Sequence, residues 1–187
     1  MGGARASDIS VRKVDGGNEA AVRSLSVTEA QLAFVSHISG MLRGANANPG
    51  VESYATLADG EAVGFFILNF DASRTAHYAA ADAECGLEGF FIDHRFQGRG
   101  YGSAAVRAMR VTVAREHPGI EKVKLTVNCR NEAAIYAYLE GGFRDTGEIY
   151  HGGRSGPQRI LAMPLHRRAK KVHPPSNPRR SGPSRSP

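Results

Sequence analysis

The sequence predicts a single α/β domain, in which strand patterns and helix patterns alternate along most of the chain. A length of 187 residues is typical of one domain, and a hydrophobic content of 41% is enough for a packed core. Two local patterns indicate the sheet. Asp59-Gly60 joins two strand patterns as a hairpin, and an apolar run at residues 90–92 leads through a glycine-rich turn into a helix pattern.

The segment before the hairpin predicts one strand and two helices. Residues 9–14 alternate apolar and polar side chains as a strand does, and residues 18–25 have the pattern of a short helix. Thr28 is a suitable N-cap for a second helix, with Gln31 as its capping-box partner. The apolar stripe of that helix consists of Leu32, Val35 and Ile38. Residues 40–50 are rich in Gly, Asn and Pro, and we expect them to form a loop.

The hairpin and the strand after it form the predicted centre of the sheet. The hairpin strands cover residues 51–57 and 62–70, a polar loop follows at 71–83, and the central strand begins at Glu84. Side chains of a strand alternate between the two faces of the sheet. One face of the central strand is therefore expected to carry Glu84, Gly86, Glu88, Phe90 and Ile92.

The rest of the chain predicts two further helices and three strands. Residues 104–115 contain neither Gly nor Pro and follow the glycine-rich turn as a helix. Its apolar stripe consists of Val106, Met109 and Val113. The later elements are a strand at 121–127, a helix at 131–140 that ends near two glycines, and a final hairpin at 143–150 and 158–163.

The glycine-rich turn predicts an anion-binding site. Its glycines allow backbone N–H groups to approach a ligand, and the following helix directs its unpaired N–H groups at the same point. These glycines are Gly98, Gly100 and Gly102. The turn is not a Walker A loop, because no Gly-Lys-Ser/Thr follows, and Ser103 stands where a dinucleotide fingerprint needs its third glycine. With Arg95 and Arg99 nearby we expect a pyrophosphate ligand; a purely structural turn is the alternative for this stretch alone.

The net charge of +6 arises at the C-terminal end. Seven of the 24 Lys and Arg lie in residues 166–187, which contain no acid, so 17 basic residues face 18 acidic ones in residues 1–165 and give that part a net charge of −1. The Pro, Ser and Arg of residues 166–187 predict a disordered tail. A nearly neutral body argues against nucleic acid as a partner, although the basic tail leaves that interpretation open.

Composition also indicates the compartment and the cofactor chemistry. No apolar run reaches membrane-spanning length, and no signal-peptide pattern opens the chain. Cys85 and Cys129 are the only cysteines, which does not favour a disulfide framework. We therefore expect a cytoplasmic protein without a membrane partner. The seven histidines lack metal-ligand spacing, so we expect no metal.

Two motifs, in the expected order, resemble the GNAT superfamily of N-acetyltransferases. Gln97-Gly98-Arg99-Gly100-Tyr101-Gly102 matches Q/R-x-x-G-x-G/A, the acetyl-CoA pyrophosphate loop of that family. Residues 131–143 match N-x-x-A-x-x-x-Y-x-x-x-G-F, its second signature. Asn131 and Tyr138 lie on one face of the second motif's helix, about 10.5 Å apart along its axis. One helix face can thus contact both the pantetheine arm and the thioester sulfur.

The resemblance covers residues 8–165 and implies the GNAT fold. This fold is a single mixed, mostly antiparallel, central sheet of six to seven strands, flanked by about four helices, with a V-shaped cleft between the central strands. The implied acetyltransferase domain spans residues 1–165 and leaves 166–187 as the tail. The resemblance implies acetyl-CoA as co-substrate and no metal. The implied cofactor-binding residues are Phe90, Phe91, Ile92, Gln97, Gly98, Arg99, Gly100, Tyr101, Gly102, Asn131 and Tyr138.

The implied chemistry is direct acetyl transfer to an amine within a ternary complex. The amine must lose a proton before its lone pair can attack the thioester. Glu88 is the candidate base, through a water, with Glu84 in reserve; a surface or structural glutamate is the alternative interpretation of Glu88. The resemblance places the backbone N–H of Ile92 at the thioester carbonyl. It implies that Tyr138 protonates the departing thiolate or donates a hydrogen bond to it.

A narrower resemblance concerns the acceptor. Residues 87–92, together with 25–35 and 142–148, are most like the bacterial diamine/polyamine (spermidine/spermine) acetyltransferases, although Gly89 departs from the second acid usual there. The leading function is acetyl transfer to a primary amine of a small molecule, with polyamines as the first class. The alternatives are peptide, protein or aminoglycoside-type drug amines, and a non-catalytic acyl-CoA-binding module. A homodimer is compatible with each.

Overall fold

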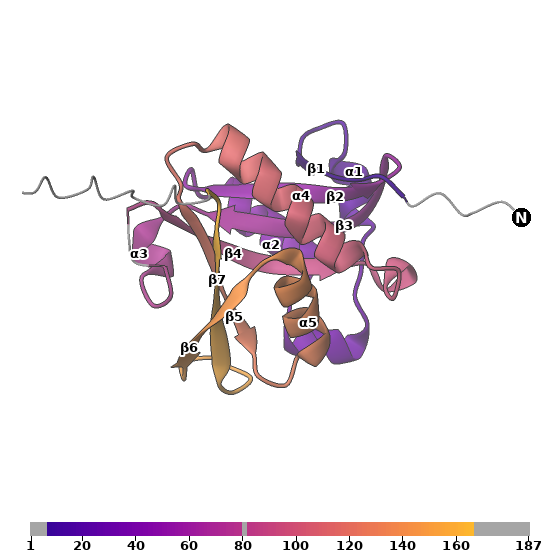
Figure 1. Ribbon diagram of the computed structural model, residues 1–187. Helices are drawn as coiled ribbons and strands as arrows, with labels where there is room; N and C mark the ends of the chain where they lie inside the picture. Colours follow the sequence, from indigo (N-terminus) through magenta and orange to yellow (C-terminus); the bar gives the residue numbers. More distant parts are fainter. Residues whose placement is uncertain (1–6, 80–81, 167–187) are drawn as a thin grey trace, which may run out of the picture.

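The computed structural model describes residues 7–79 and 82–166. Of the tail predicted at residues 166–187, all but residue 166 lies outside this description. The described chain forms a seven-stranded sheet in the order β1-β2-β3-β4-β5-β7-β6 (Figure 1). β4 and β5 are parallel, and the other neighbours are antiparallel. The predicted mixed, mostly antiparallel sheet is confirmed. The strands are β1 (Ile9–Lys13), β2 (Val51–Ala58), β3 (Glu61–Asn69), β4 (Glu84–Ile92), β5 (Lys122–Asn128), β6 (Arg144–Tyr150) and β7 (Gln158–Pro164).

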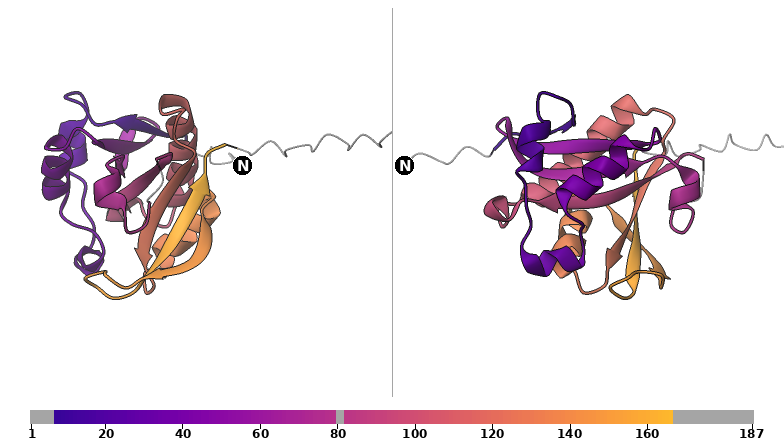
Figure 2. Two further views of the ribbon diagram at one scale, coloured as in Figure 1. Left: turned by 90° about the vertical axis from the view of Figure 1, so that its left-hand side faces the viewer. Right: turned by 180° about the vertical axis from the view of Figure 1, so that it is seen from behind.

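Helices cover both faces of the sheet (Figure 2). α1 and α2 pack on one face, and α4 and α5 share a core with the other face. The helices are α1 (Glu19–Arg23), α2 (Ile38–Asn46), α3 (Ala72–Thr75), α4 (Tyr101–Glu116) and α5 (Glu132–Gly141), with the 3-10 helices η1 (Glu29–Ala33) and η2 (His94–Phe96). Within residues 7–79 and 82–166, none of the helices is long and apolar enough to cross a membrane.

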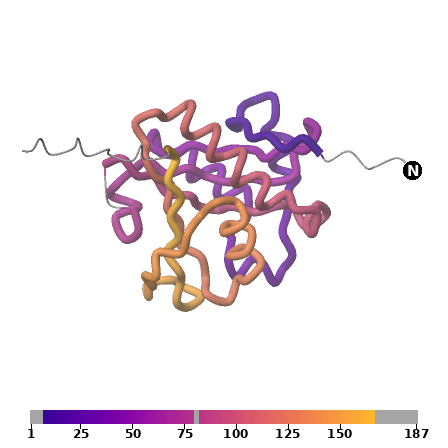
Figure 3. Tube along the Cα trace, in the orientation of Figure 1, coloured from indigo at the N-terminus to yellow at the C-terminus, as the bar shows by residue number. Residues whose placement is uncertain are grey.

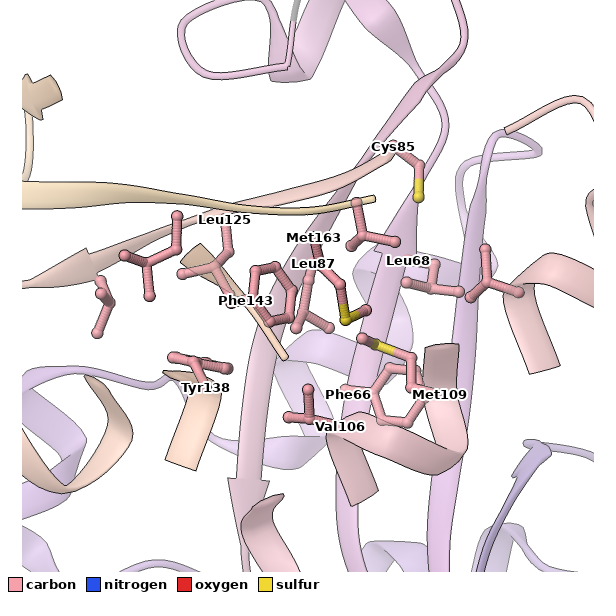
Figure 4. Close-up of a cluster of buried hydrophobic side chains, with 14 of the residues drawn as sticks. Phe66, Leu68, Cys85, Leu87, Val106, Met109, Leu125, Tyr138, Phe143 and Met163 are labelled. Carbon is pink, nitrogen blue, oxygen red and sulfur yellow. The ribbon is translucent and has the colours of Figure 1, made fainter. Parts of the chain in front are cut away.

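The larger core lies between the sheet and the helices α4 and α5 (Figure 4). Val106 and Met109 project from α4 toward Phe66 of β3, and Tyr138 of α5 lies beside Phe143. The predicted apolar stripe of α4 is confirmed, since its three members are fully buried. Burial of each such side chain stabilises the fold by about 2 kcal/mol.

The expectation of a loop at residues 40–50 is wrong, because α2 occupies most of that stretch. The apolar face of α2 consists of Ile38, Met41, Leu42 and Ala45, and it packs on the sheet. Gly40 and Gly44 lie on the open side of the helix, where an added Cβ would meet no other atom within 4 Å. A helical glycine costs only about 1 kcal/mol relative to alanine. Burial of the apolar face therefore outweighs the local preference for a loop.

The helix expected after Thr28 is shorter than predicted. Its capping box is present, and the N–H of Thr28 donates to the side-chain oxygen of Gln31 at 3.1 Å. The segment forms the 3-10 helix η1, which ends at Ala33, and the chain turns before α2 begins. The polar stretch at 71–83 also differs, since it contains the short helix α3, which is capped by Asp71.

A β-bulge at Gly89 corrects the predicted faces of the central strand. The register of β4 against β3 shifts at this point, and Gly89 has a φ of +59°. The alternation of side chains changes phase at such a bulge. Glu88 consequently lies opposite Ile67, on the face covered by α1 and α2, whereas Phe90 packs in the core under α4 and α5. The prediction that Glu88, Phe90 and Ile92 share one face is wrong.

Buried Asp93 connects the end of β4 to the N-terminal segment. Its fully buried side chain accepts hydrogen bonds from the N–H of Ser26 at 2.8 Å and from the N–H of Arg95 at 2.9 Å. The Arg95 guanidinium donates to the same carboxylate at 2.8 and 3.0 Å. Burial alone would raise the pKa of Asp93, but these hydrogen bonds and the charge of Arg95 lower it to about 2.

We predict that Asp93→Asn destabilises the protein at neutral pH and makes it less sensitive to acid. The folded-state pKa of about 2 lies below the ordinary value of 3.8, so the charged group stabilises the fold above about pH 4, and this contribution is lost as pH falls through 2. A shift of this size corresponds to about 2 kcal/mol at pH 7. Urea unfolding at several pH values between 7 and 2.5 measures the effect.

The control for this experiment is Asp145→Asn, which removes the exposed ion pair between Asp145 and Arg159. An exposed pair contributes at most about 1 kcal/mol. If the free energies of unfolding of the wild type and of Asp93→Asn fall equally between pH 4 and 2.5, the stabilising role of the Asp93 charge is contradicted.

Candidate active site

The candidate site begins where β4 and β5 separate (Figure 3). The two parallel strands pair only between residues 84–86 and 122–124. Beyond these pairs β4 continues to Ile92 and β5 to Asn128 without pairing to each other. The separation opens the sheet into a V between its two central strands.

A cleft of about 1180 Å³ occupies this opening. The end of β4, the end of β5, the glycine loop before α4, one face of α5 and residues 31–36 contribute to its lining. Every predicted site residue except Arg99 lines it: Glu88, Phe90, Phe91, Ile92, Gln97, Gly98, Gly100, Tyr101, Gly102, Asn131 and Tyr138. Its volume is large enough for a cofactor-sized ligand.

The glycine loop is shaped as an anion site requires. Gly98 and Gly100 have φ values of +75° and +77°, and Gly100 is the N-cap of α4, so the first N–H groups of that helix follow directly. Gln97 anchors the loop, since its side-chain amide donates to the carbonyl of Ile92 at 2.7 Å. The same side chain contacts Gln31 of η1 at 3.2 Å. The loop therefore has fixed contacts to β4 and to η1.

The two arginines near this loop have separate partners. Arg95 is paired with the buried Asp93, which neutralises its charge. Arg99 lies over the ring of Phe96 at 5.5 Å, and its guanidinium donates to the carbonyl of Arg95 at 3.3 Å. Arg99 lines a smaller second cavity and is not among the described residues that line the cleft. Its contribution to cofactor binding stays a prediction.

The backbone of β4 presents a donor to the cleft at Ile92. The N–H of Asp93 donates to Val63 of β3 at 2.8 Å. Because N–H directions alternate along a strand, the N–H of Ile92 points away from β3 toward the open edge. Phe91 also lines the cleft, but its ring packs in the core under α1 and α2.

Tyr138 faces the cleft from α5, within an aromatic cluster. Its ring lies 5.4 Å from that of Phe90 and 5.6 Å from that of Phe143. Burial raises the pKa of Tyr138, so its hydroxyl stays protonated at neutral pH and is available as a donor. Asn131 caps the same helix, and its side-chain oxygen accepts the N–H of Ala134 at 3.3 Å. Tyr136 is predicted from the sequence to face away from Tyr138 and to pack, but it is 68% exposed at the rim of the cleft, so this prediction is wrong.

Glu88 lies in the cleft and carries two hydrogen bonds on one oxygen. The hydroxyl of Tyr78 donates to Oε1 at 2.9 Å, and the side-chain amide of Asn69 donates to the same atom at 3.1 Å. Tyr78 also lines the cleft. The carboxylate is thus held by groups from β3 and from the turn after α3.

The reserve candidate Glu84 has a different environment. Its side chain is 6% exposed and forms ion pairs with Lys122 at 2.7 Å and with Lys124 at 3.0 Å. Burial would raise the pKa of Glu84, but the two lysines lower it overall. Glu84 is not among the described residues that line the cleft. These observations favour Glu88 over Glu84 as the predicted base.

The cleft is bridged by η1 and the β6–β7 loop, which lie side by side (Figure 2). The hydroxyl of Ser155 in that loop donates to the carbonyl of Ala33 at 2.7 Å. On the other side, Gln31 contacts the glycine loop through Gln97. Residues 31–36 therefore span the V between its two sides.

Sequence reasoning missed several residues of the cleft. Tyr78 and His77 lie in a stretch predicted as a polar loop, and Gln31 was assigned only to a capping box. A weak signal for Tyr78 is Gly86, two residues before Glu88 on the same face, where an added Cβ would overlap the Tyr78 hydroxyl. Within the described ranges no group of three or more His, Cys, Asp or Glu could hold a metal ion. Metal-free chemistry stays a prediction.

Comparisons with known proteins point to one family. Residues 15–143 match the Acetyltransferase (GNAT) family. The chain is 26% identical over 145 residues to the Spermine/spermidine N(1)-acetyltransferase of Bacillus subtilis (strain 168), over 78% of this chain and 93% of that protein. It shares the fold of aminoglycoside acetyltransferase AAC(6')-Ib in complex with coenzyme A, with a TM-score of 0.67 at 16% identity, over 84% and 95% of the two chains. It also matches spermidine N-acetyltransferase from Vibrio cholerae in complex with CoA and spermine, with a TM-score of 0.62 at 13% identity, over 84% and 95%.

We predict that Gly100→Val weakens CoA binding by about tenfold or more while the fold is retained, because a β-branched residue resists the left-handed conformation that the loop needs. No atom lies within 4 Å of the added Cβ, so the effect arises from the backbone conformation of the loop. Calorimetry with CoA measures the affinity, and thermal unfolding checks the fold.

The matched control is Gly119→Val, at a turn where the added Cβ also meets nothing within 4 Å and φ is not positive. An unchanged CoA affinity in Gly100→Val would show that the conformation of the glycine loop is not needed for CoA binding, which would contradict the prediction.

Proposed function

The chain belongs to the GNAT family of acetyltransferases and is an N-acetyltransferase, and on this basis we propose that it acetylates a primary amine of a small molecule, with polyamines as the first class. The observation that carries the proposal is the Glu88 carboxylate, which lies in the cleft next to the bulge of β4. A carboxylate at this place attracts a cationic amine and can accept its proton.

The proposed reaction uses groups from both sides of the V. Acetyl-CoA supplies the activated acetyl thioester. The glycine loop at residues 97–102 would hold its pyrophosphate, and the N–H of Ile92 would stabilise the carbonyl oxygen as it gains negative charge. Glu88 would take one proton from the amine, directly or through a water. The new bond joins the amine nitrogen to the acetyl carbon, and the carbon–sulfur bond breaks.

Tyr138 would act on the leaving sulfur. A buried phenol with a raised pKa is a weaker acid than a thiol, so complete proton transfer to the thiolate is not required. A hydrogen bond from the hydroxyl that strengthens as the sulfur becomes negative is sufficient to lower the barrier. The nitrogen loses its second proton as the carbon–sulfur bond breaks, and this proton passes to the sulfur through the Tyr138 hydroxyl or a water, so that CoA leaves as the thiol.

The charges of the cleft support a cationic acceptor. Among the described lining residues, the carboxylates are Glu88 and Glu132, and Arg154 is the one arginine or lysine. This balance leaves the cleft slightly negative. The polyamine class is further supported by the curated relatives, whose names specify spermine and spermidine. A cytoplasmic location agrees with two free thiols, Cys85 and Cys129, and a homodimer remains a proposal.

We predict that a panel of acceptors will rank spermidine and spermine above kanamycin-type aminoglycosides and above lysine peptides in kcat/KM. The physical reason is that the carboxylates of Glu88 and Glu132 attract a cation, while the bridge formed by residues 31–36 leaves less room for a branched acceptor than for a linear one. The assay follows CoA release at fixed acetyl-CoA. A preference for aminoglycosides or peptides would favour the alternative acceptors, and no turnover with any amine would favour a non-catalytic acyl-CoA-binding module.

We predict that Tyr138→Phe lowers kcat by about ten- to a thousandfold, the range of general-acid assistance, and leaves the Kd of acetyl-CoA nearly unchanged. The ring stays in its aromatic cluster, so only the hydroxyl is lost. Tyr136→Phe is the matched control, because Tyr136 lies on the same helix with its side chain exposed. A wild-type rate for Tyr138→Phe would exclude the role at the leaving group.

A further inference from the structure

Tyr78 is a residue of the cleft that the sequence motifs do not cover. It follows α3, its side chain is buried, and its hydroxyl donates to Glu88 Oε1 at 2.9 Å. We infer that Tyr78 is a positioning residue for catalysis, which holds the Glu88 carboxylate so that its second oxygen faces the acceptor amine. The inference rests on the proposed function, in which Glu88 receives the proton of that amine.

The fold makes room for this contact at a specific place. Gly86 precedes Glu88 by two residues on the same face of β4, and a side chain at Gly86 would overlap the Tyr78 hydroxyl. The turn that carries Tyr78 is itself fixed, because the hydroxyl of Thr75 donates to the carbonyl of Ala79 at 3.0 Å. The Tyr78 ring packs with Ile160 of β7 in a small separate core. The hydroxyl is therefore held over β4 by packing on several sides.

The arrangement of donors makes the carboxylate asymmetric. Tyr78 and Asn69 both donate to Oε1. No donor among the described residues is bonded to Oε2, although Glu88 lines the cleft. Burial and the charge of Glu88 raise the pKa of Tyr78, so its hydroxyl remains a donor and does not compete for the proton. One oxygen of Glu88 is thus anchored, and the other can accept the proton.

This contact has a direct kinetic consequence. A carboxylate that keeps one orientation avoids the loss of rate that follows when a base is displaced by a fraction of an ångström. Without the Tyr78 hydroxyl, Asn69 alone holds Oε1, and Glu88 can adopt rotamers that direct neither oxygen at the amine. The fraction of complexes that can react then falls, whereas the binding of acetyl-CoA at the glycine loop does not change.

A double-mutant cycle with Tyr78→Phe and Glu88→Gln tests the inference. We expect Tyr78→Phe to lower kcat by about tenfold, the scale of one hydrogen bond to a charged group. The Kd of acetyl-CoA and the melting temperature should stay close to wild type. In the Glu88→Gln background the same change should have almost no further effect, since residues that act as a unit are not additive.

The control is Tyr150→Phe, because the Tyr150 ring lies 4.6 Å from His77 in the same aromatic group, and the hydroxyl of Tyr78, not that of Tyr150, donates to Glu88. This variant should keep the wild-type kcat. A wild-type kcat in Tyr78→Phe would overturn the inference, and so would a loss that multiplies independently with that of Glu88→Gln. A wild-type kcat in Glu88→Gln would instead refute Glu88 as the base, which distinguishes failure of the proposed function from failure of the inference.

Discussion

The constraint on which the site depends is the short parallel pairing of β4 with β5. Only three residue pairs join the two halves of the sheet, near the start of both strands. Buried backbone N–H and C=O groups need hydrogen-bond partners. Beyond the three pairs, the N–H and C=O groups on the facing edges of β4 and β5 are not bonded to each other, so they can bond to a ligand in the cleft. An extended ligand with amide groups, such as the pantetheine arm of CoA, is chemically suited to this edge. The core under α4 and α5 contains residues of both halves and holds them together where the strands no longer pair.

The sequence was sufficient for elements that carry local signals. Asp59-Gly60 predicted its hairpin because both positions need positive φ, and the structure has φ values of 49° and 88° there. The glycine loop and the apolar stripe of α4 could also be predicted from the sequence. A glycine with positive φ and an apolar residue at every third or fourth position are both properties of a short segment. The cofactor side of the cleft was predicted for the same reason, because its residues belong to two continuous motifs.

Features that depend on tertiary contacts could not be predicted. α2 was taken for a loop because glycine and asparagine dominate residues 40–50 locally, while the packing of Leu42 and Ala45 on the sheet decides the outcome. The bulge at Gly89 was not predicted, because the side chains of β4 were assumed to alternate between the two faces of the sheet along the whole strand. Tyr78 and Asn69 reach Glu88 from separate segments, and Gly86 is no more than a weak signal for Tyr78. The acceptor side of the cleft is formed by segments that are distant in the sequence, so a local sequence pattern predicts few of its residues.

The bulge at Gly89 has a consequence for how two substrates reach each other. Upstream of it Glu88 belongs to the α1 and α2 face, and downstream Phe90 belongs to the α4 and α5 face. A substrate cannot pass between paired strands of a sheet. In the described sheet the two faces are therefore connected through the V, where β4 and β5 are not paired. Under the proposed roles, the acceptor approaches the sheet from one side and the thioester from the other, and they meet only within its thickness. Neither molecule then obstructs the path of the other, which is the steric condition for both to be bound when the bond forms and for each product to leave by its own route.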